Sequence, residues 1–231
     1  MNAQMKEALS KYDKNELIFA SQLYRNKLAG KISEAAFYKM LERLCENGEI
    51  VKISKGIYYY PKKGKYGMVP PSEKEIVDVF TKNNTGIVVG YSLYNELNLT
   101  TQIPKQIIVY SANTEGQVKN IGNVCIIQMR TNYSNNIKKR IRALEVLQNY
   151  NRIQDINYNA FITYSKTIAN EYDEKIYDSI IDTFKYKKST IAFLREILNY
   201  YHIPNTLNKY LSSLSEYKYP KMEEIYEIAQ L

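Results

Sequence analysis

Residues 33–60 place an amphipathic helix directly before a β-hairpin, and this order limits what the N-terminal part of the chain can form. Apolar side chains recur at the spacing of three and four that is typical of one helix face. These side chains are Phe37, Met40, Leu41, Leu44 and Cys45. Ser33 is a favourable N-cap, and the glycine of Asn47-Gly48 is typical of a helix end. Two β-rich runs, 49–53 and 57–61, are separated by three residues that end in glycine, so the sequence predicts a helix over 33–46 and a hairpin after it.

The residues before this helix are predicted to form a helix, a short strand and a second helix. Residues 3–12 and 21–28 have helical spacing, and a short apolar run at 17–20 between them favours a strand. Helix, short strand, two helices and a hairpin are the elements of a winged helix-turn-helix, whose last helix enters the DNA major groove while the hairpin lies along the backbone. We predict this fold for residues 1–66.

The net charge of +8 is unevenly distributed. Residues 1–66 contain 13 Lys/Arg against 7 Asp/Glu, residues 67–134 contain 5 against 5, and residues 135–231 contain 14 against 12. A basic module attracts phosphate backbones because each neutralised phosphate releases condensed counterions. The alternatives are a basic surface that only confers solubility and a winged helix that docks on proteins.

The buried stripe determines which residues of the helix over 33–46 face outward. Side chains near its N-terminus reach base edges best, and basic residues further along and in the hairpin contact phosphates, which position the protein without specifying sequence. The predicted base-reading residues are Glu34, Ala35, Tyr38 and Lys39. The remaining predicted DNA contacts are Lys31, Ser33, Arg43, Lys52, Ser54 and Lys55.

Lysine, glycine and proline concentrate in residues 62–71, which indicates a linker and a domain boundary. A middle unit, 67–134, then begins with Ser72 and Glu75 in the spacing of a capping box. Its predicted elements are a helix to about 82, a strand at 87–89, a helix at 91–97, and strands at 105–110 and 123–129 joined by a hairpin.

The third predicted unit, 135–231, is largely helical and packs on or extends the middle unit, so the expected fold class is α+β. Its predicted helices are 135–150, 159–170, 172–184, 190–201, 205–214 and 222–231. The first of these helices contains a basic cluster formed by Lys138, Lys139, Arg140 and Arg142. The cluster is a candidate second contact surface for nucleic acid or an acidic partner, and the favoured alternative is a solvated helix face.

Three segments in this order resemble a known family. They are 48–59, Pro70-Pro71-Ser72 and Leu99-Thr100-Thr101-Gln102-Ile103-Pro104. Together they resemble the AbiEi-like antitoxins of type IV toxin–antitoxin systems, over roughly residues 15–150.

This resemblance implies a winged-helix domain that binds inverted repeats in its own promoter as double-stranded DNA and represses the operon. It also implies that the C-terminal part counteracts a co-encoded, nucleotidyltransferase-like toxin without a stable complex. Carried over by position, the antitoxin motif contains Thr100, Thr101, Gln102 and Pro104. The favoured alternative is that these residues form the turn from helix into strand through hydroxyl and amide hydrogen bonds to the backbone.

The acidic residues, the single histidine and the two cysteines favour a binding function over catalysis. Glu174, Asp178 and Asp182 follow one another at a spacing of four, but no Gly-rich phosphate loop accompanies them, so a solvated face is favoured over a Mg²⁺ site. His202 has no orienting carboxylate that the sequence can place beside it, and Cys45 and Cys125 fit a core. We expect no enzyme, metal or cofactor.

No apolar run approaches the roughly 18 residues of a membrane span, and no N-terminal stretch resembles a signal peptide, so we expect a cytoplasmic protein without a membrane partner. The leading hypothesis is an autoregulating antitoxin. A stand-alone regulator with a dimerisation or effector region is the alternative, and a nuclease or nucleotidyltransferase built on the acidic helix is the third. The operator, the toxin and the oligomeric state stay open.

Overall fold

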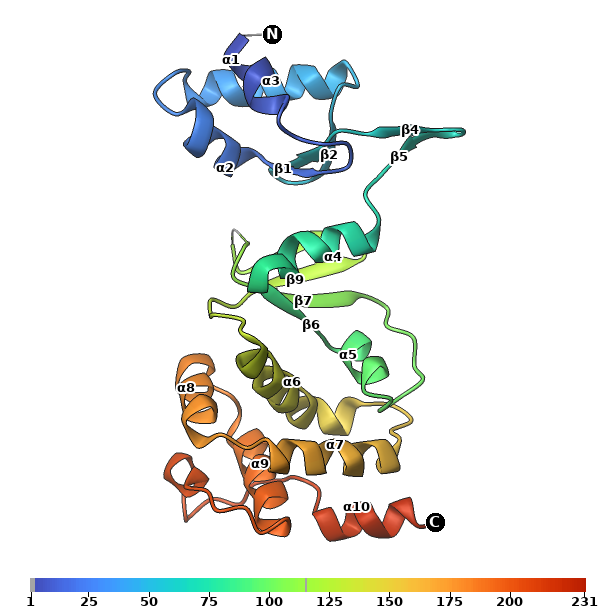
Figure 1. The fold of residues 1–231 in the computed structure, drawn as a ribbon, viewed down its shortest axis with the longest axis vertical. Coiled ribbons are helices and arrows are strands. Elements are labelled where there is room, and N and C mark those ends of the chain that lie inside the picture. The colour runs from blue at the N-terminus through green and yellow to red at the C-terminus, as the bar shows by residue number, and fades with distance from the viewer. Residues whose placement is uncertain (1–2, 115) are drawn as a thin grey trace.

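The computed structural model describes residues 3–114 and 116–231 of the chain. The fold is mixed α/β with a largely helical C-terminal region. Figure 1 shows an elongated molecule in which the first helices lie at one end, a sheet with two helices beside it occupies the middle, and the helices after residue 134 fill the other end. The expected combination of helices and strands and the expected helical C-terminal region are therefore confirmed.

The N-terminal elements enclose a small core of their own. Their bounds are α1 (Ala3–Leu9), β1 (Leu17–Phe19), α2 (Ala20–Leu23), a π-helix (Tyr24–Leu28), α3 (Glu34–Glu46), β2 (Val51–Ser54) and β3 (Ile57–Tyr59). The strands form an antiparallel sheet in the order β1-β3-β2. Ser33 caps α3 by accepting a hydrogen bond from the Ala36 amide (3.3 Å), and Phe37, Leu41 and Leu44 are buried. The predicted helix and hairpin are thus confirmed.

A second hairpin replaces the linker expected over 62–71. Strands β4 (Lys62–Gly64) and β5 (Gly67–Val69) pair antiparallel, with Gly64 opposite Gly67, and project from the side of the molecule (Figure 1). The composition was misleading because glycine also serves tight turns: Gly67 has a φ of +123°, which an L-side chain rarely adopts.

The middle elements form a mixed sheet in the order β6-β7-β9-β8. Their bounds are α4 (Glu73–Thr81), a 3₁₀ helix (Lys82–Asn84), β6 (Gly86–Val89), α5 (Tyr91–Glu96), β7 (Ile107–Ser111), β8 (Val118–Ile121) and β9 (Val124–Gln128). The predicted capping box is present, because Ser72 and Glu75 exchange hydrogen bonds of 2.7 and 3.2 Å.

The prediction that a hairpin joins the strands over 105–110 and 123–129 is wrong. Strands β7 and β9 run parallel, and β8 pairs antiparallel with β9. Strand β8 has no clear alternating apolar pattern because it lies at the sheet edge, where Val118 and Asn120 are both exposed.

The C-terminal region consists of packed helices. Their bounds are α6 (Asn135–Asn149), a 3₁₀ helix (Tyr150–Arg152), α7 (Tyr158–Asn170), α8 (Glu174–Phe184), α9 (Lys188–Tyr200), a 3₁₀ helix (Leu207–Tyr210) and α10 (Met222–Ala229). The prediction of a helix over 205–214 is wrong, because only the short 3₁₀ helix over 207–210 forms there. The Asn205 carboxamide accepts a hydrogen bond from the Leu207 amide (3.4 Å), so local side-chain bonding competes with a longer helix.

Apolar packing crosses both predicted domain boundaries. Leu17, Ile57 and Tyr59 of the N-terminal sheet belong to one core cluster with Phe80 of α4 and Val109 of β7. A larger cluster joins the opposite side of the middle sheet to α6 and the helices that follow. Within the described residues, no helix has the length and apolar character that a bilayer span requires.

Candidate functional site

Most of the predicted recognition residues of α3 lie on one face. Ala35, Lys39 and Arg43 are exposed on the side opposite the buried stripe, whereas Glu34 is exposed at the first helical position, on the side of the stripe. Lys31 and Ser33 are exposed in the segment just before the helix. Tyr38 differs, because it is half-buried and its ring packs on Phe37 at 5.2 Å. Figure 1 places α3 at the end of the molecule remote from the C-terminal helices.

The hairpin residues divide into two kinds. Lys52 and Lys55 are exposed, as a phosphate contact requires. Ser54 is half-buried, and its Oγ donates a hydrogen bond to the carbonyl oxygen of Asn120 in β8 (3.0 Å). Ser54 therefore holds the hairpin against the middle sheet, a role that sequence proximity could not indicate because its partner lies 66 residues away.

A groove of about 530 Å³ lies beside this contact. Tyr38, Ser54 and Lys55 line it from the N-terminal part, and Lys119 and Asn120 line it from β8. Lys119 was missed by the sequence analysis, which did not predict β8. The structure thus brings a basic residue of the middle sheet to the edge of the α3 and hairpin surface.

The segment 100–104 is fixed by polar contacts within the chain. Thr100 is buried, donates to the Gln154 carbonyl oxygen (2.7 Å) and accepts from the Gln102 amide (3.2 Å). The Gln102 carboxamide donates to Asp155. The Thr100 bonds involve the backbone, as the alternative interpretation expected, whereas the Gln102 bond is to a side chain, and together they attach the segment to residues 154 and 155. Ile103, by contrast, is 86% exposed.

A cavity of about 450 Å³ adjoins this segment and contains a buried carboxyl group. Glu145 of α6 accepts hydrogen bonds from the Tyr110 hydroxyl (3.0 Å) and the Asn149 carboxamide (2.7 Å). Desolvation raises the pKa of the Glu145 carboxyl, and these two donors oppose the shift. Burial also raises the pKa of Tyr94, which lines the same cavity. Nothing in the sequence distinguished Glu145 from a surface carboxylate.

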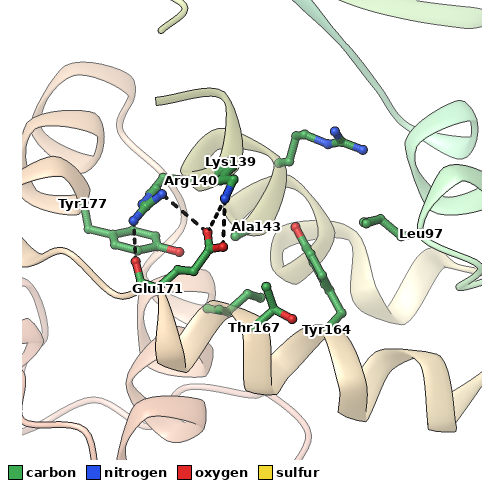
Figure 2. Close-up of a pocket in the computed structure, with 10 residues that line it drawn as sticks. Leu97, Lys139, Arg140, Ala143, Tyr164, Thr167, Glu171 and Tyr177 are labelled. Carbon is green, nitrogen blue, oxygen red and sulfur yellow. Dashed lines mark hydrogen bonds and ion pairs between the residues drawn. The ribbon is translucent and has the colours of Figure 1, made fainter. Parts of the chain in front are cut away.

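The basic cluster on α6 is not the open surface that the sequence predicted. Arg140 is only 8% exposed and donates to the carbonyl oxygen of Glu171 at the end of α7. Lys139 contacts both Glu171 carboxylate oxygens (2.8 and 2.9 Å), and Arg142 forms an ion pair with Glu96 (2.6 Å). Lys138 donates to the Asn84 carboxamide (3.0 Å). Figure 2 shows Lys139 and Arg140 directed toward Glu171.

The acidic run on α8 has structural partners. Asp178 contacts the Lys209 ammonium (2.5 Å) and accepts a hydrogen bond from the Tyr210 hydroxyl (3.0 Å), which attaches the 3₁₀ helix over 207–210 to α8. Asp173 caps α8 by accepting from the Ile176 amide (3.1 Å). In the part of the chain that the structure describes, no group of three or more His, Cys, Asp or Glu residues could hold a metal ion.

The isolated histidine and the cysteines have ordinary surroundings. His202 is exposed just beyond α9, with a φ of +58°, and its amide donates to the Asn199 carbonyl oxygen (3.0 Å). Cys45 and Cys125 are half-buried free thiols rather than fully buried core residues. Burial raises the pKa of both thiols, which lowers their reactivity.

Comparison with known proteins places the chain in a family. It belongs to DUF6088, a family of unknown function, whose sequence profile matches residues 4–168, from α1 to α7. No curated protein matches the chain. Among solved structures, it is similar to the crystal structure of RV2827C protein from Mycobacterium tuberculosis, with 10% identity and a TM-score of 0.44, over 87% of this chain and 77% of that one.

Proposed function

We propose that this chain binds double-stranded DNA through a winged helix-turn-helix in residues 1–66, represses its own operon, and acts as an antitoxin against a co-encoded nucleotidyltransferase-like toxin. The observation that carries the DNA-binding part is the exposed face of α3 at one end of the molecule (Figure 1), together with the exposed hairpin residues Lys52 and Lys55, of which Lys55 lines the same groove as Tyr38 of α3. The proposed activities require no cofactor and no metal ion.

The arrangement of elements supports a winged helix. The sheet order β1-β3-β2 places the hairpin next to β1, and α2 and α3 pack on that sheet through a shared core. A helix fits the B-DNA major groove, which is about 12 Å wide. Glu34, Ala35 and Lys39 occupy the N-terminal half of α3 and would face the base edges.

Charge supports the same orientation. Arg25, Lys27 and Lys31 lie in the π-helix and loop before α3, and Lys52 and Lys55 lie in the hairpin after it. Basic residues therefore flank α3 on both sides along the chain. Contacts with phosphates on either side of a major groove would position α3 between them.

The antitoxin part rests on the family resemblance of segments 48–59, 70–72 and 99–104. We assign the toxin-directed activity to residues 67–231, acting without a stable complex with the toxin. Thr100 and Gln102 hold the segment 99–104 in place, and the exposed Ile103 is the residue of that segment best placed to contact another molecule.

Two experiments test the proposal separately. Fluorescence polarisation measures binding of the full chain to the DNA upstream of its own gene and to a shuffled duplex of equal length. We expect at least about a thousandfold tighter binding to the upstream DNA. Equal affinity for both duplexes would contradict specific operator recognition.

The second experiment co-expresses the full chain with the product of the neighbouring gene. A Lys39→Ala/Lys55→Ala variant should still restore growth, because both lysines lie outside the region assigned to toxin neutralisation. The full chain is the appropriate form, because removal of residues 1–66 would expose the apolar surface around Phe80. If the full chain binds its operator and never restores growth, the protein is a stand-alone regulator, for which the cavity beside Glu145 offers an effector site.

A further inference from the structure

A third pocket lies among α6, α7 and α8, and three basic side chains contribute to its lining. It has a volume of about 200 Å³. Among the described residues that line it, Lys139, Arg140 and Arg142 supply positive charge and Glu171 supplies the carboxylate. Figure 2 shows Lys139 and Arg140 on one side of Glu171, with Tyr164 and Tyr177 on neighbouring helices. Positive charge in a partly enclosed site favours an anion.

The carboxylate of Glu171 indicates where an anion would lie. It is held by Lys139 at 2.8 and 2.9 Å and lies 3.8 Å from Arg140 Nη1. Its side chain is 40% exposed, whereas the Arg140 side chain is only 9% exposed. Loss of the Glu171 carboxylate alone would leave the Arg140 cation buried and unpaired, but an external anion that takes its place restores the pairing, and the partly exposed carboxylate can move into solvent.

Two tyrosine hydroxyls add uncharged donors. Tyr164 of α7 and Tyr177 of α8 both line the pocket. Burial raises the pKa of both phenols, so the hydroxyls keep their protons and can donate. Arg142 Nη2 is buried without an aligned hydrogen-bond acceptor, although it forms an ion pair with Glu96.

The geometry of these donors matches phosphate better than a carboxylate. The cations come from α6, Tyr164 from α7 and Tyr177 from α8, so the donors approach from different directions. A phosphate monoester presents three terminal oxygens in a tetrahedral array, whereas a carboxylate presents two in a plane. The volume corresponds to roughly seven water molecules, which admits phosphate or a small phosphate monoester but excludes a dinucleotide.

We propose that the pocket formed by Lys139, Arg140, Arg142, Tyr164 and Tyr177 binds a small phosphate-bearing molecule, with Glu171 as the displaceable competitor for its cations. This site is separate from the DNA-binding surface of α3 and does not depend on it. Its occupant is either free phosphate or a small organic phosphate, because both present the same oxygens.

Isothermal titration calorimetry on the full chain tests this site. The probes are inorganic phosphate, glycerol 3-phosphate and acetate, at constant ionic strength. Lys139→Gln and Arg142→Gln should each weaken phosphate binding about tenfold, as loss of a hydrogen bond to a charged group predicts. Glu171→Gln should strengthen it about tenfold, because the competing charge is removed while the side chain keeps its size.

Lys138→Gln is the matched control. It changes the same charge one residue earlier, on a side chain that contacts Asn84 outside the pocket, and should leave affinity within about twofold. Lys39→Ala/Lys55→Ala should also leave phosphate binding intact. Tighter binding of glycerol 3-phosphate than of inorganic phosphate would assign an organic phosphate, and the reverse would assign the free ion.

Three results would overturn the proposal. The first is no phosphate binding by either the wild type or Glu171→Gln. The second is equal loss of binding in Lys138→Gln and Lys139→Gln, which would indicate a general charge effect. The third is tighter binding of acetate than of phosphate. Circular dichroism of each variant shows whether it is folded, and Lys139→Gln, at a side chain that is 56% exposed, should retain its structure.

Discussion

Phe19 and Phe80 meet edge to face, with ring centroids 5.8 Å apart and ring planes at 88°. Phe19 belongs to β1 and Phe80 to α4, so this pair joins the N-terminal sheet to the middle unit. Aromatic pairs of this geometry contribute about 0.5–1.5 kcal/mol beyond area burial. The surface proposed for DNA binding is therefore packed on the rest of the protein rather than attached by a flexible linker.

Replacement of Phe80 tests this packing. Phe80→Ala should lower the free energy of unfolding by about 3–5 kcal/mol, because the side chain is fully buried and the cavity cannot refill completely. Denaturant unfolding followed by circular dichroism measures the change. Tyr66→Ala, which removes an aromatic ring that is 94% exposed, is the control and should cost about 0.5 kcal/mol or less. A loss below 1 kcal/mol for Phe80→Ala would contradict a shared core.

Gly86 provides a second test of how α4 meets the sheet. A methyl group at Gly86 would overlap the carbonyl oxygens of Phe80 and Tyr110, which are backbone atoms and cannot move aside. Gly86→Ala should therefore cost about 3 kcal/mol, at the upper end of the range for overpacking. Gly122→Ala is the comparison, since its φ of +55° adds roughly 1–2 kcal/mol of strain but its surroundings are open. Equal losses for the two variants would show that the close approach at Gly86 is absent.

Local patterns in the sequence predicted much of the secondary structure. The caps at Ser33 and Ser72 depend on residues three positions away, and both were predicted correctly because the interaction lies within one helix turn. Strand β8 was missed because it is short, two of its four residues are polar, and its stability comes from pairing with β9. The helix predicted over 205–214 failed because Asn205 bonds to its neighbouring backbone instead.

The candidate sites were less predictable because their partners are distant in the chain. Arg140 was assigned to a surface by helical spacing, yet it is buried against Glu171, 31 residues away. Ser54 was assigned to DNA, yet its hydroxyl bonds to Asn120. Exposure of Lys39 and Arg43, in contrast, followed directly from the buried stripe of α3 because the helix period fixes both faces.

The buried carboxyl of Glu145 should make stability depend on pH. Its pKa in the folded protein is raised above 4.5 by desolvation, so the folded state holds a proton that the unfolded state releases. The stability of the wild type should therefore fall as pH rises from about 4.5 to the folded pKa, by at most about 1.4 kcal/mol per pH unit. Urea unfolding of the wild type and Glu145→Gln at pH 3–8 measures the difference.

In this comparison, Glu145→Gln should gain stability relative to the wild type as pH increases through that interval. The carboxamide has no charge to desolvate and can still accept a hydrogen bond from Tyr110. Below pH 4 the difference should be constant, because the carboxyl is protonated in both states. Parallel curves for the two proteins over the whole range would contradict a raised pKa at Glu145.

The salt dependence of DNA binding tests the central claim most directly. The logarithm of the binding constant for upstream DNA should fall linearly with the logarithm of salt concentration, and Lys39→Ala/Lys55→Ala should reduce the slope by about 1–2. Lys166→Ala/Lys187→Ala removes the same charge from exposed positions in the C-terminal region and should leave the slope unchanged. Identical affinities and slopes for the wild type and Lys39→Ala/Lys55→Ala would show that α3 and the hairpin do not contact DNA.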